Sequence, residues 1–224
     1  MRVLTWNLYH GRSAPPSGRD LLPEFTAALA GWDWDVALLQ EVPPWWPPAL
    51  GAACGASART ALTSRNLGLP VRRWIAERRP DLIKSNGGGA NAILVRGSVI
   101  AEHRRATLRW LPERRVVHAV RLQGSGLWVA NLHAQVRTES GALADLDVAA
   151  RAVLGWAGDR SPVILGGDCN VPAPRADGFT YAAGQGVDHV LVRGGPVAAG
   201  PARVLRREGG LSDHPPLLIE LAGV

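Results

Sequence analysis

The sequence predicts an α+β protein built from two β-sheets that pack face to face, with helices on their outer sides. Short apolar runs recur between turn-rich stretches, and several are apolar at every position, which is typical of strands buried on both faces. Helical spacing is confined to two longer stretches. No repeat or interdomain linker interrupts the 224 residues, so we expect a single domain over residues 1–224.

The apolar runs mark the expected strands. They cover residues 3–6, 36–39, 92–95, 116–122, 127–132, 163–165, 190–192 and 217–221. Residues 12–18 and 85–89 are expected to be loops. A chain of this length buries about 70% of the surface that it exposes when unfolded, so the core needs no disulfide.

The two helical stretches are residues 20–31 and 140–158. Each carries apolar side chains on one stripe, as a helix packed against a sheet does. Gly31 and Gly158 stand where these helices are expected to end, and glycine is the usual residue just past a helix C-terminus.

The segment 43–48 is rich in proline, so we expect a loop there and neither regular helix nor central strand. Trp45 and Trp46 lie at its centre. They fit a membrane-contacting or base-stacking tip, or a hydrophobic cover for the sheet edge, and the cover is the commoner role.

The chain is basic, with 25 Lys+Arg against 19 Asp+Glu and a net charge of +6. Lys84 is the only lysine, and arginine forks match phosphate oxygens well. The positive charge favours a phosphate-bearing partner, although a preference for arginine over lysine also follows from a GC-rich genome. Paired arginines occur at 72–73, 78–79, 104–105 and 114–115. Such pairs either contact nucleic acid or are solvent-exposed ends of strands and loops.

Two cysteines, Cys54 and Cys169, form neither a disulfide framework nor a CxxC zinc motif. The first residues lack the apolar core of a signal peptide, and no apolar run approaches the ~20 residues that span a bilayer. These features predict a cytoplasmic protein without a transmembrane segment, and we expect a monomer.

Polar residues recur where the apolar runs begin or end. They are Asn7, Gln40-Glu41, Asn131 and His133, Asp168 and Asn170, Asp188-His189, and Ser212-Asp213-His214. A buried polar group without a partner costs about 1–3 kcal/mol, so this placement predicts convergence on one site at an edge of the sheets. Asp168 and Asn170 are two residues apart and face the same way, which directs Cys169 into the core.

These residues resemble the motif series of the endonuclease/exonuclease/phosphatase superfamily, which shares the deoxyribonuclease-I-like fold. The motifs are Trp6-Asn7, Gln40-Glu41, Asn131-Leu132-His133, Gly167-Asp168-Cys169-Asn170, Asp188-His189 and Ser212-Asp213-His214. The resemblance implies a four-layer α/β/β/α sandwich with the site at one edge of the paired sheets. It also implies divalent-metal-dependent hydrolysis of a phosphoester.

The resemblance assigns a role to each residue. Glu41 is the main metal carboxylate with Asn7 beside it, and the ion is Mg²⁺ or Mn²⁺. Asp168 orients or deprotonates the attacking water, and Asn170 donates a hydrogen bond to the phosphate. Asp188 pairs with His214, and the resemblance leaves open whether this pair or Asp168 is the base. Asp213 lies near the metal or holds His214, and His133 lies at the phosphate.

Two positions depart from the apurinic-site nucleases of the superfamily, which often carry an Asp two residues after the first Asn and a Tyr at the second histidine. Here these positions are Tyr9 and His133. The departures favour the deoxyribonuclease-I, sphingomyelinase and phosphatase members. The acid that supports His133 is open, and the candidates are Glu77, Asp81 and Glu102.

We therefore expect an endonuclease or exonuclease that hydrolyses phosphodiester bonds of nucleic acid without strong sequence choice. The motifs contact the phosphate and not the leaving group. A phosphatase, or a lipid phosphodiesterase acting on an inositol phosphate or sphingomyelin, thus stays open. The intact acidic and histidine residues argue against an inactive binding module.

Overall fold

The computed structural model describes residues 1–64, 66–79, 82 and 89–223. The expected loop at 85–89, apart from Gly89, lies outside the described residues, as do Asp81 and Lys84.

The first sheet has seven strands in the order β11-β13-β1-β2-β4-β3, with β12 also paired to β13. β1 and β2 run parallel, and Asn7 stands opposite Gln40 at their carboxyl ends. The strands are β1 (Arg2–Asn7), β2 (Val36–Val42), β3 (Ala56–Leu62), β4 (Ala90–Arg96), β11 (Val197–Ala198), β12 (Arg203–Val204) and β13 (Leu217–Ala222).

The second sheet has six strands in the order β5-β6-β7-β8-β10-β9. β7 and β8 run parallel, so His133 stands opposite Asp168 at their carboxyl ends. β10 runs antiparallel to β8 and places Asp188 opposite Asp168. The strands are β5 (Ile100–Arg109), β6 (Arg115–Leu122), β7 (Trp128–His133), β8 (Val163–Asp168), β9 (Thr180–Gln185) and β10 (Asp188–Arg193).

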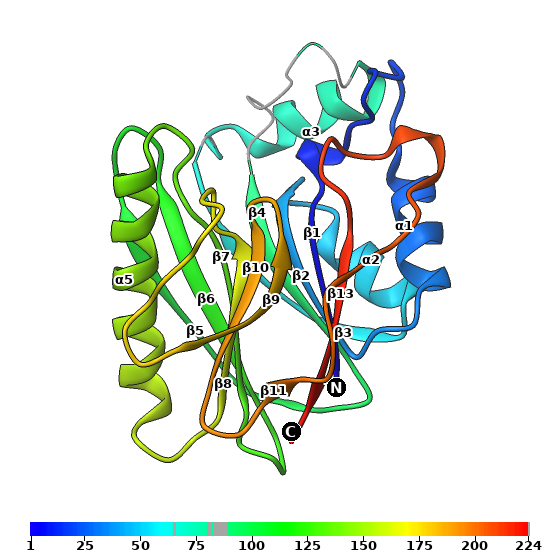
Figure 1. The fold of residues 1–224 in the computed structure, drawn as a ribbon. Coiled ribbons are helices and arrows are strands. Elements are labelled where there is room, and N and C mark those ends of the chain that lie inside the picture. The colour runs from blue at the N-terminus through cyan, green and yellow to red at the C-terminus, as the bar shows by residue number, and fades with distance from the viewer. Residues whose placement is uncertain (65, 80–81, 83–88, 224) are drawn as a thin grey trace.

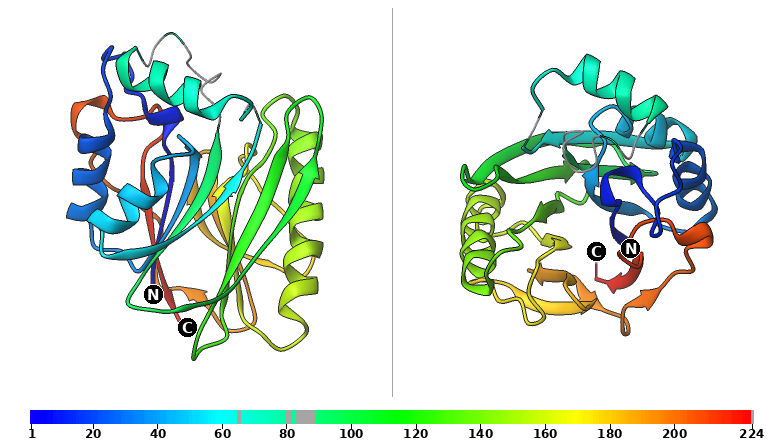
Figure 2. Two further views of the ribbon diagram at one scale, coloured as in Figure 1. Left: turned by 180° about the vertical axis from the view of Figure 1, so that it is seen from behind. Right: turned by 90° about the horizontal axis from the view of Figure 1, so that it is seen from above.

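Helices cover the outer face of each sheet, which gives the α/β/β/α layering (Figures 1 and 2). α5 (Glu139–Ala157) lies outside the second sheet, and α1 (Leu22–Gly31) and α2 (Pro47–Ala53) lie outside the first. α3 (Leu69–Arg78) lies above the upper edge in Figure 1, whereas the termini lie at the lower edge. None of the helices in the described part of the chain is long and apolar enough to cross a membrane.

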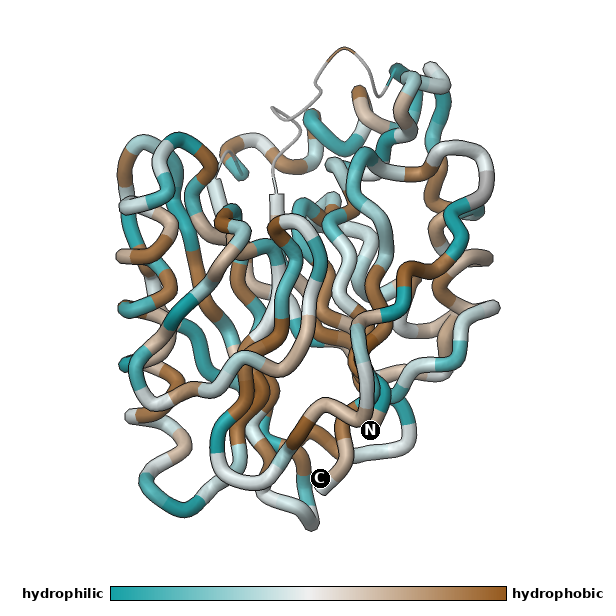
Figure 3. The backbone as a smooth tube through the Cα atoms, viewed as in Figure 1, coloured by the Kyte–Doolittle hydropathy of each residue, from teal (hydrophilic) through white to brown (hydrophobic). Residues whose placement is uncertain are grey.

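The buried apolar residues form three clusters that match these layers. One cluster fills the space between the first sheet and α1 and α2, and another lies between the second sheet and α5. The third, with Val3, Ile93 and Ile164, lies between the sheets. The hydrophobic stretches follow the strands through the interior (Figure 3). The predicted two-sheet α+β sandwich is confirmed.

All the expected strands are present, but five further strands were not predicted. β11 and β12 have only two residues each, and β3, β5 and β9 lie at the edges of their sheets. Along these three strands, the residues alternate between exposed and partly buried or are largely exposed. An edge strand exposes one face to solvent and contributes few residues to the core. They therefore lack the apolar runs that mark central strands. α3 has no buried residue, which explains why its sequence shows no apolar stripe.

The prediction that 43–48 is a loop is wrong at its end, because α2 begins at Pro47. Proline fits the first turn of a helix, where the missing N–H has no partner to lose. Trp46 is only 3% exposed and packs against Phe25, with ring centroids 5.4 Å apart. The tryptophan is a hydrophobic cover and not a projecting tip.

Candidate active site

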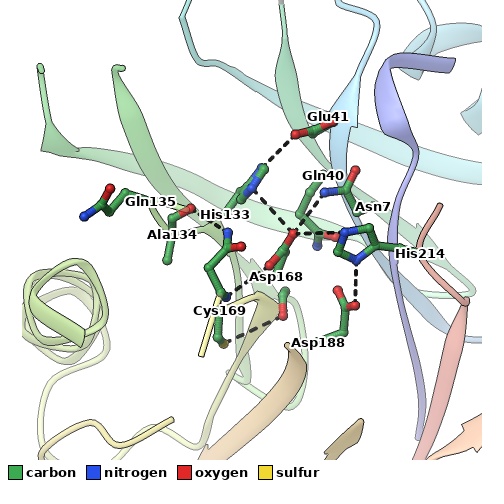
Figure 4. Close-up of polar contacts among 12 residues, drawn as sticks. Asn7, Gln40, Glu41, His133, Ala134, Gln135, Asp168, Cys169, Asp188 and His214 are labelled. Carbon is green, nitrogen blue, oxygen red and sulfur yellow. Dashed lines mark hydrogen bonds and ion pairs between the residues drawn. The ribbon is translucent and has the colours of Figure 1, made fainter. Parts of the chain in front are cut away.

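A cleft of ≈ 350 Å³ opens at the edge of the sheets where β1, β2, β7 and β8 end. Segments from most of the chain meet there. Its lining contains every predicted site residue except Asp188, namely Asn7, Glu41, His133, Asp168, Asn170, Asp213 and His214. Asp188 lies behind His214 (Figure 4).

Asp168 and its strand neighbours occupy the floor of the cleft. The parallel and antiparallel pairings of β8 place His133 on one side of Asp168 and Asp188 on the other. Gly167 precedes Asp168 with a φ of 132°, and a Cβ there would lie 2.1 Å from the Leu132 carbonyl oxygen. Only glycine permits β7 and β8 to approach so closely at this point.

Carboxylates and imidazoles alternate across the floor (Figure 4). His133 Nε2 lies 3.5 Å from Asp168 Oδ2, and His214 Nε2 lies 3.9 Å from the same oxygen. On its far side, His214 Nδ1 hydrogen-bonds Asp188 Oδ2 at 2.9 Å. Asp168 is thus held between two imidazoles, one of which is oriented by a second carboxylate.

The charges of this group differ from those of free side chains. Burial opposes the charge on His214, but the hydrogen bond and the charge of Asp188 raise the pKa of His214 to about 9. Burial and the neighbouring charge of Asp188 raise the pKa of Asp168 to about 7, against the opposing effects of His214 and Asn7. At neutral pH the imidazole is therefore protonated, and Asp168 is poised to gain or lose a proton.

Glu41 reaches the cleft because the β2–β4 pairing is irregular between Leu39 and Val42. The residue has a φ of 49° and is half-buried, whereas its neighbour Gln40 points into the interior. Burial raises the pKa of Glu41, but the hydrogen bond from His10 and the charges of His10, His133 and Arg115 lower it to about 2. Glu41 is therefore ionised across the physiological range.

Two residues of the site were missed by the sequence analysis. His10 Nε2 lies 3.1 Å from Glu41 Oε2, and its φ of 54° belongs to a short turn after Asn7. Arg115 is buried beside the cleft and pairs with Glu113 at 3.1 Å. The only sequence signal for His10 is its nearness to the Trp6-Asn7 motif, and that for Arg115 is its place in an arginine pair.

On the Nδ1 side of His133 the acid is Glu41, whose Oε1 lies 3.9 Å from that nitrogen, whereas Asp168 lies on the Nε2 side. Of the predicted candidates, Glu102 pairs with Arg104 and Arg121, and Glu77 pairs with Arg73. Neither accounts for the orientation of His133. Burial lowers the pKa of His133 to about 3, with Arg115 acting in the same direction, so this imidazole is neutral.

Asn7 and Ser212 connect the start of the chain to its end. Asn7 Nδ2 donates to Asp168 Oδ2 at 3.0 Å, and its Oδ1 accepts the Tyr9 N–H at 2.9 Å. Ser212 Oγ donates to the Asn7 carbonyl at 2.6 Å and accepts the His214 N–H at 3.0 Å. These contacts fix His214 relative to Asp168 although the two come from distant segments.

The other asparagines have different environments. Asn170 Nδ2 donates to the Ala134 carbonyl at 2.9 Å, and its backbone N–H donates to Asp168 Oδ1 at 3.1 Å. Asn131 is fully buried and donates to the carbonyls of Leu39 and Ala92, so it joins the two sheets instead of lining the cleft. Cys169 is buried in the core, as predicted.

The model of the endonuclease/exonuclease/phosphatase family matches residues 4–214. The chain belongs to this family. Members of the endonuclease/exonuclease/phosphatase family are hydrolases that act on phosphoesters. No curated protein matches the chain by sequence.

Solved structures of the family share the fold at low identity. A Beutenbergia cavernae endonuclease/exonuclease/phosphatase superposes with a TM-score of 0.72 and 20% identity, covering 99% of this chain and 71% of that one. The mannosyl-6-phosphatase of Bacteroides thetaiotaomicron gives 0.71 and 16%, covering 99% of both. TDP2 from Caenorhabditis elegans gives 0.68 and 17%, covering 98% and 73%.

Proposed function

We propose that the protein is a divalent-metal-dependent phosphodiesterase that cleaves nucleic acid, with Mg²⁺ or Mn²⁺ as its ion. The observation that carries the proposal is the cleft floor, in which Asp168 lies between neutral His133 and protonated His214, with ionised Glu41 nearby. This arrangement provides an acid, a base and a metal carboxylate around the space for one phosphate.

The donor set fits a hard divalent cation. Glu41 is ionised and faces the cleft, and Asn7 and Asp213 add oxygen atoms at its lining, which suits Mg²⁺ or Mn²⁺. Donor atoms of Asp168, Asp188 and His214 also lie within 4.8 Å of one another, but the Asp188–His214 hydrogen bond already accounts for two of them. When bound, the ion neutralises charge on the phosphate oxygens.

Asp168 is the general base in this proposal. Its pKa of about 7 matches a group that must accept a proton near neutral pH. Hydrogen bonds from Asn7 to Oδ2 and from the Asn170 N–H to Oδ1 fix the carboxylate plane. Asp168 can therefore orient a water molecule and take its proton.

His214 supplies the positive charge opposite the base. Asp188 accepts from Nδ1, which leaves the Nε2–H directed at the cleft side of Asp168. In that position it can donate to a phosphate oxygen and stabilise charge that develops there. Neutral His133 and the second N–H of the Asn170 amide, whose first N–H donates to Ala134, provide further contacts for the phosphate.

The choice of nucleic acid depends on the charge of the chain. The net charge of +6 attracts a polyanion, and Arg114 and Arg115 are among the residues that line the cleft. Contacts to phosphates fix position but not sequence, so we propose cleavage without strong sequence choice. The single domain over residues 1–224, the monomeric state and the cytoplasmic location stay predictions.

The test is a panel of plasmid, single-stranded DNA, RNA, abasic duplex, sphingomyelin, an inositol phosphate and bis-p-nitrophenyl phosphate, each with Mg²⁺ and with Mn²⁺. We expect plasmid nicking that a chelator abolishes. Asp168→Asn and His214→Ala should each lower the rate by roughly 10²–10⁴-fold, as the loss of an acid or base does.

Cys169→Ser is the matched control, because Cys169 adjoins Asp168 but its thiol is buried and points away from the cleft. This variant should stay active. Hydrolysis of the small ester or of a lipid, with no cleavage of DNA or RNA at low salt, would reassign the substrate to the phosphatase or lipase class.

A further inference from the structure

A second hollow of ≈ 400 Å³ lies beside the cleft, between the edge strands β3 and β5 of the two sheets. We call it the arginine groove. It is lined by Leu62, Arg105, Ala106, Thr107, Arg114 and Val116.

The alternation of β5 explains the polar lining of the groove. Ala106 and Leu108 pack against the cluster beneath α5. Because successive side chains of a strand point to opposite faces, Arg105 and Thr107 lie on the other face, where β3 of the first sheet contacts β5 and β6 of the second. The groove thus forms between two edge strands that belong to different sheets.

Arg114 joins the groove to the catalytic cleft, because it lines both. Its guanidinium donates to the Leu62 carbonyl, and its backbone N–H donates to Ser64. These contacts hold the side chain at the boundary between the two hollows. The Arg114 Nε is buried and has no hydrogen-bond partner among the described residues.

The charges of the groove are not neutralised within the described part of the chain. Neither Arg105 nor Arg114 has a carboxylate within salt-bridge distance there, whereas the adjacent Arg104 and Arg115 pair with Glu102 and Glu113. Arg104 is on the same strand as Arg105 but on its opposite face. The two arginines without a carboxylate partner among the described residues therefore both line the groove, and Arg114 also lines the cleft.

We propose that the arginine groove binds a second phosphate of a nucleic-acid strand whose reacting phosphate lies in the cleft, an inference that rests on the proposed function. Arg105 donates its fork to that phosphate, and Thr107 adds a hydroxyl beside it. Arg114 lies between the two phosphates. The groove thus distinguishes a polymeric substrate from a small phosphodiester.

The experiment compares wild type, Arg105→Gln and Arg104→Gln on a labelled oligonucleotide and on bis-p-nitrophenyl phosphate. Arg105→Gln should lower kcat/KM for the oligonucleotide by about tenfold, through a higher KM. The slope of log affinity against log salt concentration should become shallower by about 0.7–0.9, as expected for the loss of one phosphate contact. Hydrolysis of the small ester should not change. Arg104→Gln should match wild type on both substrates, and Arg105→Lys should restore part of the affinity.

Binding of the same oligonucleotide in excess chelator, followed by fluorescence anisotropy, gives a readout that is independent of turnover. Equal binding by Arg105→Gln and Arg104→Gln would overturn the groove assignment while leaving the proposed function intact. A wild type that hydrolyses the small ester but neither binds nor cleaves nucleic acid would overturn both. If Arg105→Gln lost binding only to vesicles that contain phosphoinositides, and not to the oligonucleotide, the groove would be assigned to a lipid headgroup and not to nucleic acid.

Discussion

Asp188 does not line the cleft, yet it determines the charge of a residue that does. Its carboxylate accepts from His214 Nδ1 and is itself buried, so the interaction is little screened by water. The imidazolium is stabilised, and Nε2 is left to face Asp168. A buried residue outside the cleft lining thereby favours the charged form of an imidazole within it.

Asp188→Asn should lower the pKa of His214 from about 9 towards its ordinary value of 6.5. The amide has no charge to favour the imidazolium, while burial still opposes it. The pKa can be measured by NMR titration of the imidazole signals in metal-free protein. Asp213→Asn is the control, because Asp213 is exposed and has the weakest of the effects that raise this pKa.

The same shift has a consequence for stability. Because the pKa of His214 is higher in the folded protein, the pair stabilises the fold fully below pH 6.5, and this contribution is lost as the pH rises through about 9. The stability advantage of wild type over Asp188→Asn should decline across that window in urea titrations. An unchanged His214 pKa in Asp188→Asn would contradict the charge assignment.

At the level of elements, the ends of four strands bring the site together. The parallel pairs β1–β2 and β7–β8 each deliver polar residues at their carboxyl ends. Gly167 allows the second of these pairs to close beneath Asp168, with Asn131 and Gln40 also within 3.1 Å of a Cβ built there. The precision of the site therefore depends on a residue with no side chain.

Gly167→Ala should destabilise the protein by roughly 2–4 kcal/mol, because the methyl group meets backbone oxygen and the φ of 132° is strained for any other residue. Urea unfolding measures the loss. Gly155→Ala is the matched control, since Gly155 lies in α5 with nothing within 4 Å of the new Cβ. It should be neutral or stabilising by about 0.5–1 kcal/mol. Equal stability of the two variants would show that β7 and β8 can separate at no cost.

Across the whole molecule, the two sheets are joined by an apolar layer and by a small polar bridge. Gln40 Nε2 donates to Asn131 Oδ1 at 2.8 Å, and Asn131 in turn donates to carbonyls of β2 and β4. The bridge lies between the sheets, close to the cleft. It fixes Glu41 on one sheet relative to His133 and Asp168 on the other.

The metal proposal predicts a change in the stability of the entire fold. An ion that binds only the folded state raises the melting temperature by mass action. Mg²⁺ or Mn²⁺ should therefore raise Tm for wild type and for Glu220→Gln, an exposed acid on β13. The increase in Tm on adding metal should be much smaller for Glu41→Gln. Scanning calorimetry measures it, with each variant compared with its own metal-free form. A full Tm rise in Glu41→Gln would exclude Glu41 as a metal ligand.

The central strands, the layering and the family could all be predicted from the sequence. Continuous apolar runs such as residues 163–165 can only be buried on both faces, and the polar residues that follow them mark one sheet edge. These signals are local, and each is carried by a few neighbouring residues. They also sufficed to predict that Asp188 pairs with His214, through the family resemblance.

Several side-chain contacts of the site became visible only in the folded chain. The edge strands β3 and β5 have no apolar run, because half of each strand faces solvent, so the groove between them is invisible in the sequence. His10 reaches Glu41 through a turn with a positive φ, and the irregular β2–β4 pairing directs Glu41 into the cleft. Such contacts depend on register and backbone geometry between distant segments, and no periodicity within one segment encodes them.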